Sequence, residues 1–179
     1  IKATPVALDA LVATIDVDPG FPAFVEFCRS EGLGISVLSD GLDRAIKGVL
    51  TRYKLDLPFA ANALEQVGDD GWKLTFPHMK PSCVSQSGNC KCAAAMAKAA
   101  PSTVMVGDGR SDFCISNRAT YVLAKGSLAN HCETNNLPHG KFNIFDEATI
   151  LLKQWLSDAK AARAEAENTS RSRRRVIGS

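Results

Sequence analysis

The sequence predicts an α/β fold with a parallel sheet. Two short apolar runs of the buried-strand type, at residues 35–38 and 103–106, each lead into a polar turn and then into a helical pattern. Strands that alternate with helices in this way build parallel sheets covered by helices. The 179-residue chain is 45% hydrophobic and 22% charged, which is the composition of a folded domain that can bury one core.

The first half of the chain alternates helical and extended patterns, interrupted by turn residues such as Pro19-Gly20. The Asp69-Asp70-Gly71 turn lies between two short apolar runs and predicts a hairpin. The expected elements are helices at 4–15, 22–31 and 42–53, an extended run at 57–63, and hairpin strands at 64–67 and 72–76. A polar loop follows at residues 78–92, and it is long enough to carry function.

The second half repeats the strand-helix alternation. Pro101 ends an alanine-rich helix, and a short apolar strand then runs into Gly107-Asp108-Gly109. The expected elements are helices at 91–100, from 112, from 128 and from 146 to about 166, with strands at 103–106 and 121–124. We expect residues 168–179 to form a basic disordered tail.

Charge and targeting signals exclude several classes of partner. The net charge is only +2, and the tail holds much of the excess in Arg171, Arg173, Arg174 and Arg175. The near-neutral remainder gives no reason to expect nucleic acid or membrane partners. The chain has no apolar run of spanning length and its first residues do not resemble a signal peptide, so we expect a cytoplasmic protein. Its six cysteines are then expected to be thiols or ligands, and not a disulfide framework.

Two polar segments follow the predicted buried strands. Ser39-Asp40-Gly41 offers a hydroxyl and backbone amides that could donate to a phosphate, although taken alone the segment is better explained as a turn that caps the next helix. Asp108 and Asp112 lie four residues apart across a strand-to-helix turn, where two carboxylates can face one Mg²⁺ ion. Helix capping would explain Asp112 but not Asp108. Lys91, at the start of a helix between these segments, could neutralise phosphate.

The order of these motifs resembles the haloacid dehalogenase superfamily. The resemblance extends to about Trp155. The residues around the motifs are similar to the subgroup that contains phosphoserine phosphatase and a methionine-salvage phosphatase acting on a hydroxy-keto-methylthiopentenyl phosphate, and the likeness to the second is the greater. It implies a three-layer Rossmann-like fold and a small phosphorylated metabolite as substrate. It also implies that Ser39, Lys91 and Asp108 are catalytic, that Ser39, Asp40, Gly41 and Lys91 bind phosphate, and that Asp108 and Asp112 bind Mg²⁺.

The family's opening Asp-x-Asp motif is missing from its expected place. Asp16-Val17-Asp18 is a tempting substitute, but Pro19-Gly20 follows it immediately and only 23 positions separate Asp16 from Ser39. We therefore expect a fragment that lacks the central first strand and its nucleophile and is inactive alone. The expected divisions are a remnant of a helical cap and linker at 1–20, the core at 21–167, and the tail at 168–179.

Two alternative functions rest on other residues. A non-catalytic zinc module could form from His78, Cys83, Cys90 and Cys92. However, Cys90 and Cys92 have only one residue between them, and zinc ligands usually have about two to four. The arginine-rich tail could bind nucleic acid, but no aromatic residues interleave with its arginines to stack on bases. Both remain subordinate to the phosphatase hypothesis.

Overall fold

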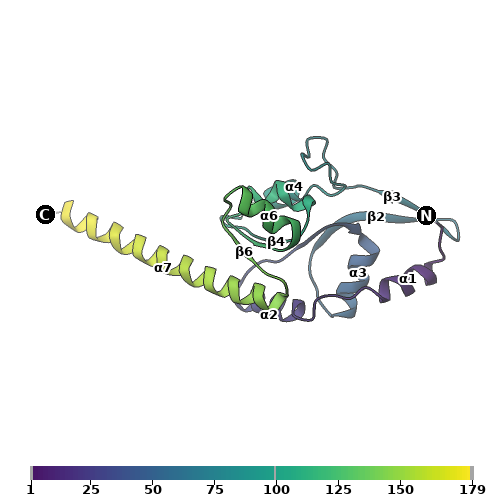
Figure 1. Cartoon of the computed structure of the whole chain (residues 1–179), viewed down its shortest axis with the longest axis horizontal. Helices are drawn as coiled ribbons and strands as arrows, with labels where there is room; N and C mark the ends of the chain where they lie inside the picture. Colours follow the sequence, from purple (N-terminus) through teal and green to yellow (C-terminus); the bar gives the residue numbers. More distant parts are fainter. Residues whose placement is uncertain (1, 99, 178–179) are drawn as a thin grey trace.

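The computed structural model describes the backbone of residues 2–98 and 100–177, and the side chains of residues 2–98 and 100–168. It is an α/β structure with two three-stranded sheets, and the long C-terminal helix extends away from the body (Figure 1). The predicted α/β class is therefore confirmed, but the strands do not form one parallel sheet.

The first sheet has the order β1-β2-β3. β1 (Val37–Leu42) pairs parallel with β2 (Phe59–Val67), and α3 (Asp43–Arg52) connects them. β3 (Gly71–Thr75) pairs antiparallel with β2, which confirms the predicted hairpin. α1 (Pro5–Ala13) packs on α3, after the Thr4 side chain caps its first turn. This sheet is therefore mixed, because the hairpin needs an antiparallel partner.

The second sheet is fully parallel and has the order β4-β5-β6. Its strands are β4 (Val104–Gly107), β5 (Tyr121–Ala124) and β6 (His139–Lys141), and its connections hold η1 (Arg110–Asp112), α5 (Phe113–Ser116) and α6 (Gly126–Thr134). Side chains of β5 alternate between two cores: Val122 packs with Cys92, Ile115 and Leu128 on one face, and Leu123 packs on the other. Helices thus cover both faces, as in a three-layer α/β unit.

Two further helices hold the halves together. α2 (Phe21–Ser30) packs against α7 (Phe145–Ile177) beneath the second sheet. Phe24 of α2 enters that core, while Val25, one residue later, enters the separate core formed with Leu50, Leu55 and Leu57. The same helix therefore buries residues against both halves, and its burial stabilises their arrangement.

The two sheets are not joined by a strand ladder. β1 ends one sheet and β4 begins the other, and across the residues described here neither pairs with the other or with a third strand on its free side. An unpaired strand edge is unfavourable, because it leaves a row of backbone N–H and C=O groups without partners.

Several element boundaries differ from those predicted. β1 continues through Ser39-Asp40-Gly41 to Leu42, and α4 (Lys91–Met96) stops before the predicted end at residue 100. β6 was not predicted, because His139-Gly140-Lys141 has no apolar run and is defined by pairing with β5. α7 continues past the predicted end near 166 to Ile177, since no Pro or Gly interrupts it. Residues 178–179 of the expected tail lie outside the described residues, and the divisions at residues 20 and 167 stay a prediction.

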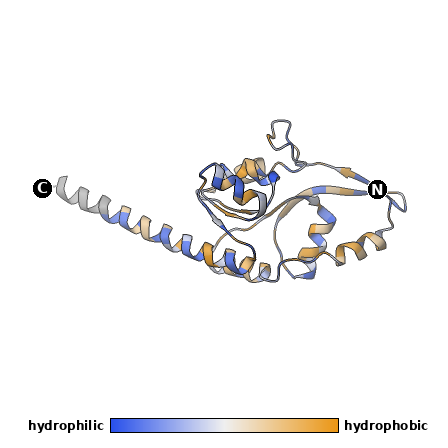
Figure 2. Ribbon diagram, viewed as in Figure 1, coloured by the Kyte–Doolittle hydropathy of each residue, from blue (hydrophilic) through white to orange (hydrophobic). Residues whose placement is uncertain are grey.

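Helix α1 carries much of its apolar surface on the outside. Figure 2 shows this helix as largely hydrophobic, and Val6 and Leu11 are 79% and 63% exposed. Leu8 alone of the α1 residues is buried, in a small core with Leu64 and Trp72. Nothing in the described part of the chain identifies what covers this face.

Candidate active site

A buried ion pair links the first residue of α4 to the turn after β4. The Lys91 ammonium lies 2.5 Å from Asp112 Oδ1 and donates to the Ser111 hydroxyl at 2.9 Å. The two charged side chains are only 11% and 5% exposed. A buried pair of this kind persists only where further hydrogen bonds satisfy the remaining polar atoms, because desolvating two charges is costly.

The other oxygen of Asp112 supplies those bonds. Asp112 Oδ2 accepts from the backbone N–H groups of Asp108 and Gly109, at 3.2 Å each, so the side chain folds back over its own turn. Gly107 makes room for it: a Cβ at position 107 would lie 2.5 Å from Asp112 Oδ2. Because Gly107 has no side chain, the Asp112 carboxylate can approach the backbone closely at this position.

Asp108 contrasts with Asp112. Its side chain is exposed, and no described residue donates to its carboxylate. Mg²⁺ sites in proteins commonly use one or two carboxylates, with water and substrate phosphate as the other ligands. Asp108 is therefore suited to act as a metal ligand. Both oxygens of Asp112, in contrast, already accept hydrogen bonds, one from Lys91 and the other from the backbone of the turn. The predicted metal role of Asp112 stays a prediction.

The Ser39-Asp40-Gly41 segment lies within β1, where the pairing with β2 is irregular between Leu38 and Leu42. Ser39 Oγ accepts from the Gly41 N–H at 2.9 Å, a local bond between residues two apart. The segment does not cap α3, since Leu42 is the N-cap and makes no side-chain cap bond. The Ser39 hydroxyl hydrogen is still available as a donor.

Asn89 connects this segment to the lysine. Its side-chain Nδ2 donates to the backbone oxygens of Ser39 and Ala60, at 3.1 and 2.7 Å, and its backbone N–H donates to Asp40 Oδ1 at 2.8 Å. The side chain is fully buried. Since Asn89 bonds to the first sheet and Lys91, two residues later, bonds to the turn after β4, residues 89–91 span the two halves of the site.

The sequence alone did not predict a role for Asn89, because the amino-acid type does not show whether an asparagine in a loop is buried or exposed. Its neighbour Gly88 has a matching constraint: a Cβ there would lie 2.7 Å from both Asn62 Oδ1 and Phe76 Cδ1. Asn62 Nδ2 also donates to the Asp40 backbone oxygen at 2.7 Å. The side-chain oxygens of Asn62 and Asn89 are buried without a hydrogen-bond partner among the described residues, which is uncommon for polar groups in folded proteins.

The alternative acidic pair, Asp16 and Asp18, makes no hydrogen bond to Ser39, Lys91, Asp108 or Asp112 in the described structure. Asp18 Oδ1 accepts from the Gly20 N–H at 2.9 Å and Oδ2 accepts from the Phe145 N–H at 3.2 Å, so it holds the start of α2 to the start of α7. Asp16 is exposed in the connection between α1 and α2. Neither follows a strand, which is where ligands bind in parallel α/β sheets.

The zinc hypothesis gains no support from the geometry. In the described part of the chain no three His, Cys, Asp or Glu side chains lie together in a way that could hold a metal ion. Cys83, Cys90 and Cys92 belong instead to the core cluster beside the second sheet.

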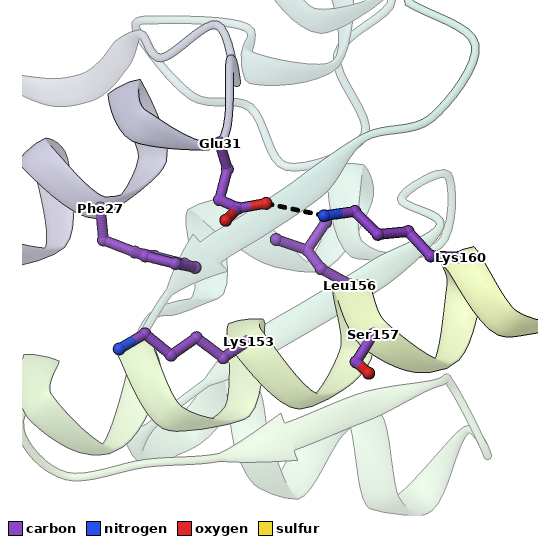
Figure 3. Close-up of a pocket in the computed structure, with 6 residues that line it drawn as sticks. All are labelled: Phe27, Glu31, Lys153, Leu156, Ser157 and Lys160. Carbon is purple, nitrogen blue, oxygen red and sulfur yellow. Dashed lines mark hydrogen bonds and ion pairs between the residues drawn. The ribbon is translucent and has the colours of Figure 1, made fainter.

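A separate shallow hollow lies between α2 and α7. Figure 3 shows the ion pair of Glu31 with Lys160 across it, at 2.9 Å. Its other lining residues are Phe27, Lys153, Leu156 and Ser157. None of these is a predicted site residue.

Among the described helices, none combines the length and the apolar character that a membrane crossing requires.

Known proteins resemble this chain in sequence. It is 30% identical over 152 residues to a 2-hydroxy-3-keto-5-methylthiopentenyl-1-phosphate phosphatase of Brevibacillus brevis, covering 82% of this chain and 68% of the relative. It is 25% identical over 180 residues to the polyol phosphate phosphatase PYP1 of Saccharomyces cerevisiae, covering 92% of this chain and 74% of the relative. The chain thus spans about two thirds of the length of the curated relatives it matches. No family model matches the chain.

Solved structures support the same fold. A probable phosphoserine phosphatase from Vibrio cholerae superposes with a TM-score of 0.64 at 19% identity, over 89% of this chain and 49% of that one. A HAD family hydrolase from Salmonella enterica gives a TM-score of 0.57 at 21% identity, over 80% of this chain and 49% of that one. The fold, the order of motifs and the sequence relatives agree, and the chain belongs to the haloacid dehalogenase-like phosphatases.

Proposed function

We propose that this chain carries the phosphate-binding and metal-binding part of a Mg²⁺-dependent phosphatase that hydrolyses a small phosphomonoester. The observation that supports it most directly is the buried contact between Lys91 and Asp112, 2.5 Å apart at the turn after β4. A lysine fixed in this way presents its charge at a defined place without needing to be ordered when substrate arrives.

Phosphate binding is assigned to Ser39, Asp40, Gly41 and Lys91. Ser39 keeps a hydroxyl donor, and Lys91 has three N–H donors, of which the contacts to Ser111 and Asp112 use two. The remaining N–H is directed to the substrate phosphate in this proposal. Catalysis of phosphoryl transfer is mostly positioning and charge stabilisation, and these are the properties that a buried, paired lysine provides.

Asp108 is assigned to Mg²⁺, because its exposed carboxylate has free oxygens at the same turn in the described structure. Bound there, Mg²⁺ would offset the negative charge of the phosphate oxygens. Asp112 lies beside it and is proposed as a further metal-site residue, with its hydrogen bonds to Lys91 and the turn fixing the geometry.

The nucleophile is proposed to come from a strand that is not among the described residues. The separation of β1 from β4 is consistent with a missing central strand, since each has one side without a strand partner in the described structure. An aspartate at the end of such a strand would attack phosphorus, release the alcohol, and form an aspartyl-phosphate that water then hydrolyses. In this proposal residues 1–20 are a remnant of a helical cap and linker, residues 21–167 are the core, and the chain alone is inactive.

The substrate is proposed to be a small metabolite of the kind named for the Brevibacillus relative, a methylthiopentenyl phosphate of methionine salvage. The polyol phosphate named for the yeast relative is of the same chemical class, an alcohol phosphate with polar substituents. The shared requirement is a phosphomonoester that fits beside Ser39 and Lys91. A cytoplasmic location is part of the same proposal, since such metabolites occur there.

Binding of inorganic phosphate tests the proposal without requiring turnover. We expect the chain to bind phosphate in Mg²⁺ buffer by calorimetric titration, with about tenfold or greater weakening in Lys91→Met and Asp108→Asn. Lys98→Ala is the matched control, because Lys98 is exposed beyond α4. Equal affinity in all four proteins would contradict the assignment of Lys91 and Asp108.

Turnover tests the missing strand. The chain alone is expected to give no Mg²⁺-dependent hydrolysis of para-nitrophenyl phosphate, and a longer protein that adds a strand ending in Asp-x-Asp is expected to be active. Hydrolysis by the chain alone that is lost in Asp16→Asn would show that Asp16 is the nucleophile.

A further inference from the structure

Lys125 follows β5 directly and lies beside the candidate metal ligand Asp108. In the ladder between β4 and β5, Gly107 is in register with Ala124, and the Lys125 N–H donates to the Gly107 oxygen at 3.0 Å. The next residue on each chain segment is therefore Asp108 or Lys125, and residues in register lie side by side on the same face of a sheet. The pairing thus brings an acidic and a basic residue together at the carboxyl edge of the parallel sheet, where ligands bind in such folds.

The backbone after Lys125 closes around Asp108. The Asp108 carbonyl accepts from the Leu128 N–H and from the Ser127 hydroxyl, at 3.2 Å each. A Cβ at Gly126, whose φ is +56°, would lie 3.0 Å from the Asp108 carbonyl oxygen and 3.9 Å from the Asp108 Cβ. These contacts hold the first turn of α6 against Asp108, so the fold itself keeps Lys125 next to the candidate metal ligand.

The Lys125 ammonium has no carboxylate partner among the described residues. Its Nζ instead lies 5.7 Å from the centroid of the Phe142 ring, and the side chain is partly buried. Phe142 is 1% exposed, so its ring is a fixed surface under the lysine. A lysine that rests on an aromatic ring keeps its N–H donors for another ligand.

The charges already assigned to the candidate site leave a deficit. The Lys91 charge is balanced by Asp112 at 2.5 Å, and the Asp108 carboxylate would offset half the charge of a bound Mg²⁺. The phosphate of a monoester carries a charge of about −1.5 to −2 at neutral pH. Without a further cation, a phosphate bound there would therefore keep up to about one negative charge without compensation.

We propose that Lys125 is a second phosphate-binding lysine, which donates to an oxygen of the phosphate that Mg²⁺ holds at Asp108. The proposal rests on the proposed phosphatase function, in which Asp108 is the metal ligand. The Lys125 ammonium supplies the positive charge that the neutral pair of Lys91 and Asp112 does not, and it does so from β5, the strand next to that of Asp108.

The same position predicts an opposite effect on the metal. While no phosphate is bound, an ammonium next to Asp108 repels Mg²⁺, because like charges at short range raise the free energy of binding. Replacing Lys125 with an uncharged residue should therefore tighten Mg²⁺ binding and weaken phosphate binding. Loss of a purely structural contact with Phe142 would not move the two affinities in opposite directions.

Calorimetric titrations of the folded chain test both effects. Lys125→Met is expected to weaken the binding of inorganic phosphate in Mg²⁺ buffer about fivefold or more, as loss of a charge-assisted hydrogen bond does. Without phosphate, the same variant is expected to bind Mg²⁺ about twofold more tightly at physiological ionic strength. Lys125→Arg keeps the charge, and both affinities should stay close to those of the unmodified chain.

Lys141→Met is the matched control. Lys141 is on β6, in register with Ala124 and so one position before Lys125, and its ammonium lies 3.7 Å from Glu133. The variant removes the same charge and should change neither affinity. Unchanged phosphate affinity in Lys125→Met would overturn the inference, and so would an equal loss in Lys141→Met.

The result for the unmodified chain separates this inference from the proposed function. Phosphate binding that depends on Lys91 and not on Lys125 contradicts the inference alone. Absence of phosphate binding by the unmodified chain contradicts both.

A measurement without variants is independent of any folding defect. In brief pulses of an acetylating reagent on the unmodified chain, Mg²⁺ and phosphate together should slow the acetylation of Lys125 and leave that of Lys141 unchanged, as read by peptide mass spectrometry. Equal acetylation of Lys125 with and without phosphate would overturn the contact.

Discussion

The Lys91 ammonium lies 2.5 Å from Asp112 Oδ1, and both side chains are almost completely shielded from solvent. The pair joins α4 to the turn after β4, two elements separated by 21 positions in the sequence. Removing either partner leaves the other charge buried without compensation, whereas removing both leaves no such charge.

A double-mutant cycle tests this coupling. Lys91→Met and Asp112→Asn are each expected to lower the free energy of unfolding by about 3–5 kcal/mol, and the double variant by less than the sum. The measurement is urea denaturation followed by circular dichroism. Strict additivity would show that the two side chains do not interact in solution.

Asn89→Ala is expected to destabilise the chain by about 1–3 kcal/mol. The substitution leaves the partly buried backbone oxygens of Ser39 and Ala60 without this donor, and unsatisfied buried acceptors cost about this much. Denaturation midpoints give the value. Asn135→Ala is the control, since Asn135 is exposed and its side chain bonds to His131 at the end of its own helix. Similar midpoints for both variants would argue against the bridge at Asn89.

Gly107→Ala is expected to displace the Asp112 carboxylate. The added Cβ would lie 2.5 Å from Asp112 Oδ2, so either the side chain or the turn must move, at about 1–3 kcal/mol. Gly109→Ala, two residues later, meets no atom within 4 Å in the described structure and should change stability little. Thermal denaturation of the two variants compares them directly, and the opposite order of stabilities would contradict the role of Gly107 as a cradle for Asp112.

Asp18→Ala is expected to lower stability by about 1 kcal/mol, while Asp16→Ala should leave it nearly unchanged. Asp18 accepts from the backbone N–H groups of Gly20 and Phe145, where α2 and α7 begin, and caps of this kind contribute about that amount. Asp16 is exposed and has no such bond to any described residue. Calorimetric melting distinguishes the two variants. A larger loss of stability in Asp16→Ala than in Asp18→Ala would contradict the structural role given to Asp18.

The local sequence was sufficient for most elements, because turn residues and apolar spacing act over a few positions. The hairpin around Asp69-Asp70-Gly71, the helix after Pro22 and the strand at 121–124 all occur where they were predicted. The sequence also placed Lys91 at the start of a helix and Asp112 at the start of another. The order of these motifs was enough to identify the family, since order and spacing are properties of the chain itself.

Contacts between distant residues were decided only by the tertiary structure. The partner of Lys91 is Asp112, and Asp108 is left exposed, because the direction in which each carboxylate points depends on the turn and on the space that Gly107 leaves. β6 exists because β5 supplies its hydrogen bonds, and Asn89 is structural because β1 and β2 both place backbone oxygens around it. Burial and hydrogen-bond pairing are properties of a packed chain, and no single stretch of sequence carries them.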